Sequence, residues 1–253
     1  MAKHTKIRMK LTEDNYYSRE ANLRYMSVSQ LKSFLQCEAK TMAELKGEYE
    51  DNRNNTALLF GGYCDAAIEG TLDRFKAENP QIFKKNGELY SEFAKAEELV
   101  RLIQADPLFH KFLSGEKQVI LTFELFGVPW KIKLDSFVRG ICITDLKTAK
   151  DTKGLPKWRY DIQGAVYQKG VELNNLGTLP FYLAVATKEE VPDLNIFQIP
   201  QSTLDLALME VQENLPHIIE VKTGKIPPTR CENCDYCKRT RKTMIRNYNE
   251  LLE

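Results

Sequence analysis

The spacing of apolar residues is helical in the first part of the chain. The first twenty or so residues are polar and aperiodic, and we expect an arm or a poorly ordered lead-in there. Residues 27–30 have the form of a capping box, and apolar side chains then recur every three or four positions. This pattern predicts a helix over residues 27–46 that contains Cys37, followed by a charged, asparagine-rich linker over residues 48–55.

A second helix is predicted over residues 57–69, where Gly70 ends the pattern. Gly61, Asp65 and Glu69 would share one face of this helix because they are four residues apart. Two adjacent glycines inside a helix cost about 1 kcal/mol each relative to alanine. We therefore expect another stretch of backbone to lie close to Gly61 and Gly62.

The period changes to that of strands in the middle of the chain, after a helical pattern over residues 87–113. Three apolar and polar alternations separated by short turns predict an antiparallel meander. A continuous apolar run further along is typical of a strand buried on both sides. The predicted strands are residues 119–125, 130–138, 141–147, 180–187 and 195–199, and the later helices are residues 158–173 and 202–221, with a last basic helix in the tail.

This order of elements indicates an α/β fold. We predict a single domain over residues 1–253 with its core at about residues 57–190. The helix at residues 27–46 and the cysteine-containing tail at residues 225–253 would pack on this core as accessory elements.

Composition adds limits to this picture. The chain has 253 residues, of which 43% are hydrophobic and 28% charged, enough for a sizeable core. It has neither an apolar run of about 18 residues nor an apolar segment near its start, so we expect a cytoplasmic protein without a membrane partner. Its net charge of +1 means that any binding of nucleic acid depends on local basic clusters. Such clusters are residues 238–242 with Arg246, and Lys84 with Lys85.

Candidate chemistry begins with two aspartates and a lysine on the predicted meander. Asp145 and Lys147 are two residues apart on one strand and therefore share a face. Asp135 would join them from the preceding antiparallel strand, across the turn at Arg139 and Gly140. Two carboxylates and an ammonium can hold a hard divalent cation beside an activated water, although such a pattern is also common on a solvated sheet face.

The helix and strand motifs together resemble a known superfamily. Gly61 and Asp65 on a helix, then Asp135, then Asp145-Leu146-Lys147, then Gln163 and Tyr167 occur in the chain order of the PD-(D/E)XK nucleases. The resemblance extends over about residues 25–242 and is to the RecB-like and RecE-like branch, including its phage-encoded exonuclease family. It implies a restriction-endonuclease-like fold, with a central mixed β-sheet flanked by helices.

The resemblance also implies roles for these residues. Asp135, Asp145 and the main-chain carbonyl of Leu146 would bind Mg²⁺ or Mn²⁺. Lys147 would hold the nucleophilic water or stabilise charge on the phosphate. Gln163 and Tyr167 would orient Lys147 or the phosphate, although Tyr167 is equally compatible with a core position.

Three further acids are candidate ligands. Many members of this branch have a metal-binding histidine where this chain has Asp65, a hard ligand that could serve instead or be satisfied by backbone or lysine. Glu69, one turn further along the helix, could take this role. Glu124 on the preceding strand is a candidate ligand through water, by resemblance to related exonucleases.

The six cysteines include three within seven residues, which are Cys231, Cys234 and Cys237. In a reducing compartment such a group favours metal over disulfides. Some RecB-like nucleases hold an iron–sulfur cluster with three late cysteines and one upstream cysteine, and Cys37 stands at the matching upstream position. We favour a [4Fe-4S] cluster, with tetrahedral Zn²⁺ or no metal as alternatives. Cys64 and Cys142 lie in apolar segments and are interpreted as small buried hydrophobes.

The resemblance implies a divalent-metal-dependent exonuclease that acts on DNA ends in phage recombination or repair. It would bind DNA through phosphates without reading sequence, and would pass single strands to a phage annealing protein. Related exonucleases form ring-shaped homo-oligomers. The alternatives are an iron–sulfur nuclease of the CRISPR-adaptation type, which trims single-stranded ends, and a catalytically idle DNA-binding or scaffold protein.

Overall fold

The computed structural model describes residues 9–51, 56–243, 245 and 247–251. The chain forms two compact units. The larger unit is made from Met1–Val28 and Asn52–Leu215, and the smaller unit from Ser29–Asp51 and Pro216–Glu253, in each case where described. The predicted accessory elements at residues 27–46 and 225–253 thus lie almost entirely in one unit. That the two units act as a single domain stays a prediction.

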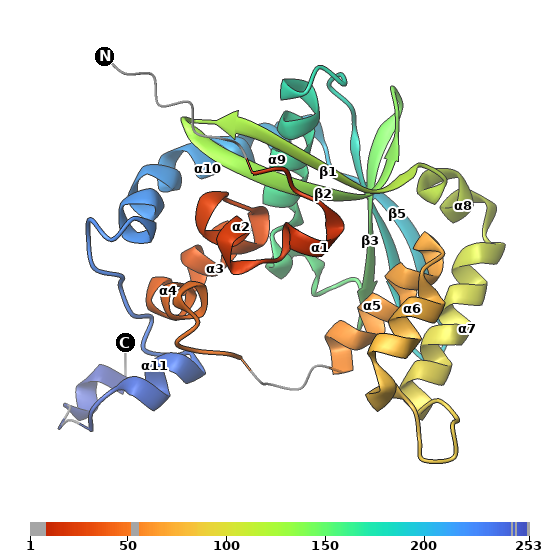
Figure 1. The fold of residues 1–253 in the computed structure, drawn as a ribbon, viewed down its shortest axis with the longest axis horizontal. Helices are drawn as coiled ribbons and strands as arrows, with labels where there is room; N and C mark the ends of the chain where they lie inside the picture. The colour runs from red at the N-terminus through yellow and green to blue at the C-terminus, as the bar shows by residue number, and fades with distance from the viewer. Residues whose placement is uncertain (1–8, 52–55, 244, 246, 252–253) are drawn as a thin grey trace. The chain divides into compact units, whose positions relative to one another are not determined.

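A five-stranded mixed sheet organises the larger unit, in the order β1-β2-β3-β4-β5 (Figure 1). All neighbouring strands are antiparallel except β3 and β4, which are parallel. The predicted α/β fold with a central mixed sheet flanked by helices is confirmed. The strands are β1 (Glu116–Leu125), β2 (Val128–Val138), β3 (Cys142–Ala149), β4 (Phe181–Thr187) and β5 (Leu194–Gln198).

Helices lie on both faces of this sheet because alternate strand residues are apolar on each side. Leu146 of β3 points into a core with residues of α5, α7 and α8, and α5, α6 and α7 lie side by side (Figure 1). On the other face, α9 lies along β4 and the β1–β2 hairpin. The helices are α5 (Thr56–Glu69), α6 (Leu72–Glu78), η1 (Pro80–Ile82), α7 (Ser91–Ala105), α8 (Pro107–Leu113), η2 (Leu155–Trp158), α9 (Tyr160–Leu173) and α10 (Gln201–Lys222).

The start of the described chain is ordered, so the expected arm is wrong from residue 9 onward; residues 1–8 lie outside the described part. Helices α1 (Glu13–Tyr16) and α2 (Arg19–Arg24) lead to Met26, which is fully buried. Met26 pairs with β2, donating its N–H to the Pro129 carbonyl at 2.8 Å and accepting from Lys131 N–H at 2.9 Å. The local sequence could not reveal this pairing, because it joins residues more than a hundred positions apart.

Two predicted helices are broken. The pattern over residues 27–46 is α3 (Val28–Gln36) and α4 (Glu38–Lys46), with Cys37 extended between them at φ −164°. The pattern over residues 87–113 divides at Asp106, whose side chain caps α8 by accepting from Leu108 and Phe109 N–H. In both cases one residue leaves helical geometry without interrupting the apolar period.

The glycine pair of α5 meets a side chain, not the backbone that we expected. A Cβ at Gly62 would lie 2.9 Å from the Phe75 ring of α6, whereas one at Gly61 would make ordinary contact with Thr148. Gly70 ends the helix at φ +79°, as predicted.

The smaller unit contains most of α3, then α4, the last turns of α10 and α11 (Asp235–Thr240). The last helix, η3 (Tyr248–Leu251), follows a short segment that contains Arg246, which lies outside the described residues. No described helix combines the length and the apolar character that crossing a membrane requires.

The buried Lys131 generates a prediction about pH. Its ammonium donates to the Tyr16 carbonyl and, at 2.7 Å, to Asn22 Oδ1, and burial lowers the pKa of Lys131 from 10.5 to about 8. Between these values the unfolded chain binds more protons than the folded one, so stability should rise with pH. We expect the difference in unfolding free energy between wild type and Lys131→Met to grow in favour of wild type from pH 8 to 10. Urea titrations measure it, and exposed Lys95→Met should give a flat difference. A flat difference for Lys131→Met as well would contradict the prediction.

Candidate active site and cysteine centre

The acid site lies where β2 separates from β3. Pairing between these strands ends at Ser136 and Thr144, and Asp135 and Asp145 are the next residues along each strand. Pairing of β2 with β1 and of β3 with β4 continues past this point, so the β1–β2 hairpin turns away from the rest of the sheet (Figure 1). The two aspartates therefore face the opening between diverging strands.

Lys147 and Gln163 each contact one oxygen of the Asp145 carboxylate. Lys147 Nζ lies 2.5 Å from Asp145 Oδ2 and 3.8 Å from Asp135 Oδ2. From α9, Gln163 Nε2 donates to Asp145 Oδ1 at 2.7 Å. The structure thus brings together four of the predicted residues, Asp135, Asp145, Lys147 and Gln163.

Asp145 is the most deeply buried member, with 1% of its surface exposed. Its Oδ2 is buried and, despite the nearby ammonium, makes no hydrogen bond of acceptable geometry among the described residues. Burial of a carboxylate is costly unless a donor or a cation compensates it, and the Lys147 ammonium beside Oδ2 does so in part. The atom is thus a suitable ligand for a hard cation, as are the carboxylates around it.

Two further carboxylates share this environment. Burial, together with the charge of Asp145, raises the pKa of Asp135 well above its ordinary value. Burial raises the pKa of Asp65 to about 7, with Lys147 opposing the shift and Asp145 adding to it. Asp65 on α5 therefore lies within electrostatic range of the other site residues, so each carboxylate makes ionisation of the others harder.

The ammonium of Lys147 offsets this negative charge. Burial by itself lowers the pKa of Lys147, but Asp145 and Asp135 more than offset it, and the pKa is raised. The ammonium also donates to the Leu146 carbonyl at 3.1 Å, the main-chain oxygen that we predicted as a metal ligand.

Tyr167 lies four residues along α9 from Gln163. Burial, followed by the charge of Asp145, raises the pKa of Tyr167 far above its ordinary value, so its hydroxyl stays protonated. Its ring packs edge-on against Phe181, with centroids 6.1 Å apart. Tyr167 therefore borders the site, and its role stays a prediction.

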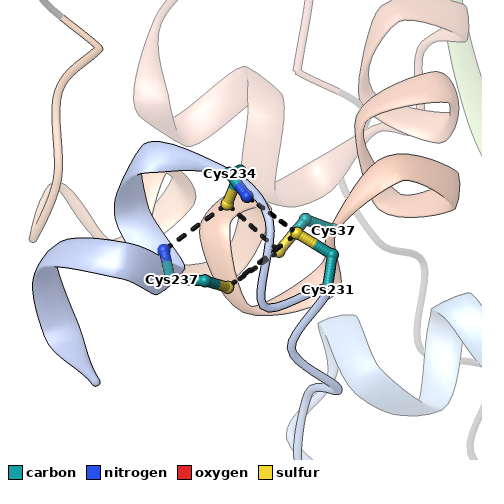
Figure 2. Close-up of side chains that lie close together, drawn as sticks. All are labelled: Cys37, Cys231, Cys234 and Cys237. Carbon is teal, nitrogen blue, oxygen red and sulfur yellow. Dashed lines mark hydrogen bonds between the residues drawn. The ribbon is translucent and has the colours of Figure 1, made fainter. Parts of the chain in front are cut away.

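The four predicted cysteines converge in the smaller unit (Figure 2). Their sulfurs all lie within 4.8 Å of one another. Cys37 Sγ is 3.6 Å from Cys237 Sγ and 3.8 Å from Cys234 Sγ, and Cys231 Sγ is 4.0 Å from Cys237 Sγ. The four sulfurs thus form a set able to hold a metal.

Backbone donors and a neighbouring acid support this centre. Cys231 Sγ accepts from Cys234 N–H at 3.3 Å, and backbone N–H groups lower the pKa of Cys231 to about 6, whereas burial raises that of Cys237 to about 12. The buried carboxylate of Glu38, next to Cys37, accepts from the N–H and hydroxyl of Thr229, both at 2.8 Å. The segment leading to Cys231 is thereby tied to α4.

Comparison with known proteins gives a family for the chain. Residues 27–240 match the PDDEXK-like domain of unknown function DUF3799. The chain belongs to this PDDEXK-like family. None of the curated proteins matches it.

One solved structure agrees with this assignment. A crystal structure described as a "putative exonuclease" from Eubacterium rectale is 44% identical, with a TM-score of 0.92 over 96% of this chain and 98% of that chain. The structure of SSO0001 aligns with 16% identity and a TM-score of 0.31 over 82% of this chain and 93% of that one, too low to support an argument. The predicted resemblance to PD-(D/E)XK nucleases is confirmed at the level of fold and family.

Two of the predicted acids of this PDDEXK-like domain have different positions. Glu69 accepts a hydrogen bond from Gln118 Nε2 and, through its charge, is among the groups that raise the pKa of Asp65, so it borders the site. Glu124 pairs with Pro129, six residues from Asp135 along β2, which is about 20 Å. Glu124 therefore does not belong to this group of acids, and the resemblance misplaced it.

Sequence reasoning also missed neighbours of the site. Lys147 Nζ lies 5.8 Å from the centre of the Tyr160 ring. Lys133 Nζ lies 4.9 Å from the Tyr17 ring and 5.8 Å from the Tyr16 ring, and Asp135 is among the charges that raise the pKa of Tyr16. The adjacent tyrosines at 16 and 17 could have indicated that this segment packs against the site, but the segment was expected to be an arm.

The predicted basic clusters have different settings. The side chains of Lys238, Arg239, Arg241 and Lys242 are exposed in the smaller unit. In the larger unit, Lys84 is also exposed but lies 3.1 Å from the Glu88 carboxylate, which offsets its charge.

Repulsion between the crowded carboxylates of the acid site should lower the stability of the folded protein. Asp135→Asn removes one of three acids around Lys147 while preserving side-chain shape. In EDTA we expect this variant to be more stable than wild type by roughly 0.5–2 kcal/mol. Urea unfolding at neutral pH measures the difference, with exposed Asp73→Asn as the control. A destabilised Asp135→Asn protein would mean that repulsion in the site is negligible.

Proposed function

We propose that this PDDEXK-like nuclease is a Mg²⁺- or Mn²⁺-dependent deoxyribonuclease that hydrolyses phosphodiester bonds at DNA ends. The observation that carries the proposal is the clustering of the buried Asp145 carboxylate with Asp135 around Lys147. Carboxylates gathered at this cost in repulsion are typical of a site built for a divalent cation.

Asp135 and Asp145 would hold the cation, with Asp65 and the Leu146 carbonyl as further ligands. When bound, the cation supplies Lewis acidity toward the phosphate and makes hydroxide available near neutral pH. Asp65 supplies a hard oxygen where the family histidine is absent, so the substitution keeps a ligand at this position.

Lys147 acts as a cation in this scheme because it lies between two carboxylates. Its ammonium can donate a hydrogen bond to the attacking water or to a phosphate oxygen. Gln163 fixes the carboxylate of Asp145 through its own hydrogen bond and thereby positions Lys147 indirectly. Tyr167 offers a protonated hydroxyl at the same edge.

The choice of DNA ends rests on the resemblance to phage exonucleases and on the description of the Eubacterium rectale neighbour as a "putative exonuclease". The proposed setting is phage recombination or repair, with single strands passed to an annealing protein and a homo-oligomer as the working form. Exposed lysines and arginines at residues 238–242 would contact phosphates, so affinity should fall steeply with salt.

The convergence of the four cysteines is also what a second candidate needs, the iron–sulfur nuclease of the CRISPR-adaptation type that trims single-stranded ends. Zn–S bonds of 2.3 Å place the sulfurs of a tetrahedral site about 3.8 Å apart. Three sulfur pairs are 3.6–4.0 Å apart and all four sulfurs lie within 4.8 Å of one another, which is nearer to the spacing of a single tetrahedral ion than to a four-iron cluster, in which each cysteine binds a different iron. For this centre we therefore propose zinc in place of the [4Fe-4S] cluster that the resemblance implies.

Replacing the central residues tests the catalytic proposal. Asp145→Asn and Lys147→Ala should each reduce Mg²⁺- or Mn²⁺-dependent degradation of end-labelled linear duplex by about 100-fold or more. DNA affinity in a filter-binding assay and the circular dichroism spectrum should change little, because phosphate contacts elsewhere remain.

The controls are Asp73→Asn and Lys95→Ala, which change exposed residues of α6 and α7. Full activity of Lys147→Ala would overturn the catalytic assignment. Cleavage of closed circular DNA would overturn the requirement for ends, and a preference for single strands would favour the second candidate. A wild-type protein that binds but never cleaves would favour the idle scaffold.

Metal analysis tests the cysteine centre. Protein purified anaerobically should carry about one zinc ion per chain, without the brown colour of an iron–sulfur cluster, and Cys234→Ala should lose it. Cys142→Ala, which removes a buried cysteine outside the centre, should retain the metal. Iron with broad visible absorption would instead establish the cluster, and absence of both metals would contradict a metal centre.

A further inference from the structure

An apolar pocket opens beside the acid site within the larger unit. It has a volume of about 540 Å³, in the range of sites for small organic groups. Its surface is mostly apolar, with few polar groups. Its lining includes Arg159, Tyr160, Asp161, Leu183, Phe197 and Thr203.

The strand register places the floor of this pocket in line with Asp145. Asp145 of β3 pairs with Leu183 of β4, and Leu183 pairs with Phe197 of β5. Paired residues point to the same face, and neighbouring strands are about 4.8 Å apart. The pocket floor therefore begins one strand from the proposed metal ligand and ends about 10 Å from it.

Tyr160 forms a common wall. It lines the pocket, and its ring lies 5.8 Å from Lys147 Nζ. Since Lys147 also contacts Asp145 and Asp135, Tyr160 lies between the pocket and the acid site.

The charges at the pocket disfavour phosphate as its occupant. The guanidinium of Arg159 donates to Asp161 at 3.0 Å and to Glu210 at 2.9 and 2.6 Å. Two carboxylates thus face one arginine, which leaves no surplus positive charge. The remaining wall suits an uncharged, flat group that can stack on Tyr160 and Phe197.

We propose that this pocket receives the nucleobase next to the cleaved bond, while the phosphate lies at the acid site. The inference rests on the proposed nuclease function and adds a base-binding subsite to it. Nucleic acid offers this alternation of charged phosphate and apolar base, and bases stack on aromatic side chains without regard to sequence. The subsite would hold a base unpaired from its partner strand and so align the bond to be cut.

Removing either the base or the pocket floor tests this proposal. Linear DNA with an abasic nucleotide on either side of the cleaved bond should be cleaved roughly 5- to 150-fold more slowly by wild type at one of the two positions. Phe197→Ala should be slow on intact DNA and largely insensitive to the missing base. Thr203→Trp, which fills the pocket from an exposed position, should behave similarly. Phe126→Ala is the matched control, because Phe126 and Phe197 are both 39% exposed.

An equal abasic penalty in wild type and in both pocket variants would overturn the proposal. A binding measurement separates this failure from failure of the nuclease function. In the Asp145→Asn background, 2-aminopurine at the sensitive position should change its fluorescence on binding, and Phe197→Ala or Thr203→Trp should abolish that change. A fluorescence change without any cleavage by wild type would retain the subsite and reject the nuclease. Unchanged fluorescence with bound DNA would reject the subsite whatever the activity.

Discussion

The buried carboxylate of Asp145 is the constraint on which the site depends. Lys147 Nζ lies 2.5 Å from one of its oxygens and Gln163 donates to the other at 2.7 Å, and these two contacts offset the cost of burying the carboxylate. Lys147 comes from the same strand, two residues further on, whereas Gln163 comes from α9 on the face of the sheet. The separation of β2 from β3 then leaves room for Asp135 to approach the same ammonium. Strand divergence and charge compensation are therefore two parts of one arrangement.

Close approach of α9 to the sheet makes the contact of Gln163 with Asp145 available. A Cβ at Gly164 would lie 2.7 Å from the Phe181 ring, and one at Gly170 would collide with Phe123 of β1. Glycine at both positions allows the helix backbone to lie nearer to the strands than side chains would otherwise permit. Packing of α9 and the electrostatics of the site are thus coupled, since a helix held further out would leave Asp145 with a single partner.

The features that could be predicted from the sequence are those that depend on the local spacing of apolar residues. Alternation identified the three strands of the meander, and a continuous apolar run identified β4. Two-residue spacing correctly placed Asp145 and Lys147 together and Leu146 in the opposite core. The features that the sequence did not predict depend on contacts between residues far apart in the chain. Cys37 leaves helical geometry where four sulfurs converge, the N-terminal helices are ordered by pairing of Met26 with β2, and Tyr160 becomes a neighbour of Lys147 only through packing of α9. The error at Glu124 arose because resemblance carries no register.

The strand register places a charged residue and apolar residues side by side in one row across the sheet. Asp145 on β3 is charged and buried, and its paired neighbours Leu183 and Phe197 on the next two strands are apolar. Because β3 and β4 are parallel, they need a crossover, and α9 with the loop before it supplies this connection and also brings Arg159 and Tyr160 over the same row. The same segment therefore covers the apolar end and positions Gln163 at the charged end. A chain that binds alternating phosphates and bases needs both kinds of surface within about 10 Å, and this crossover provides them together.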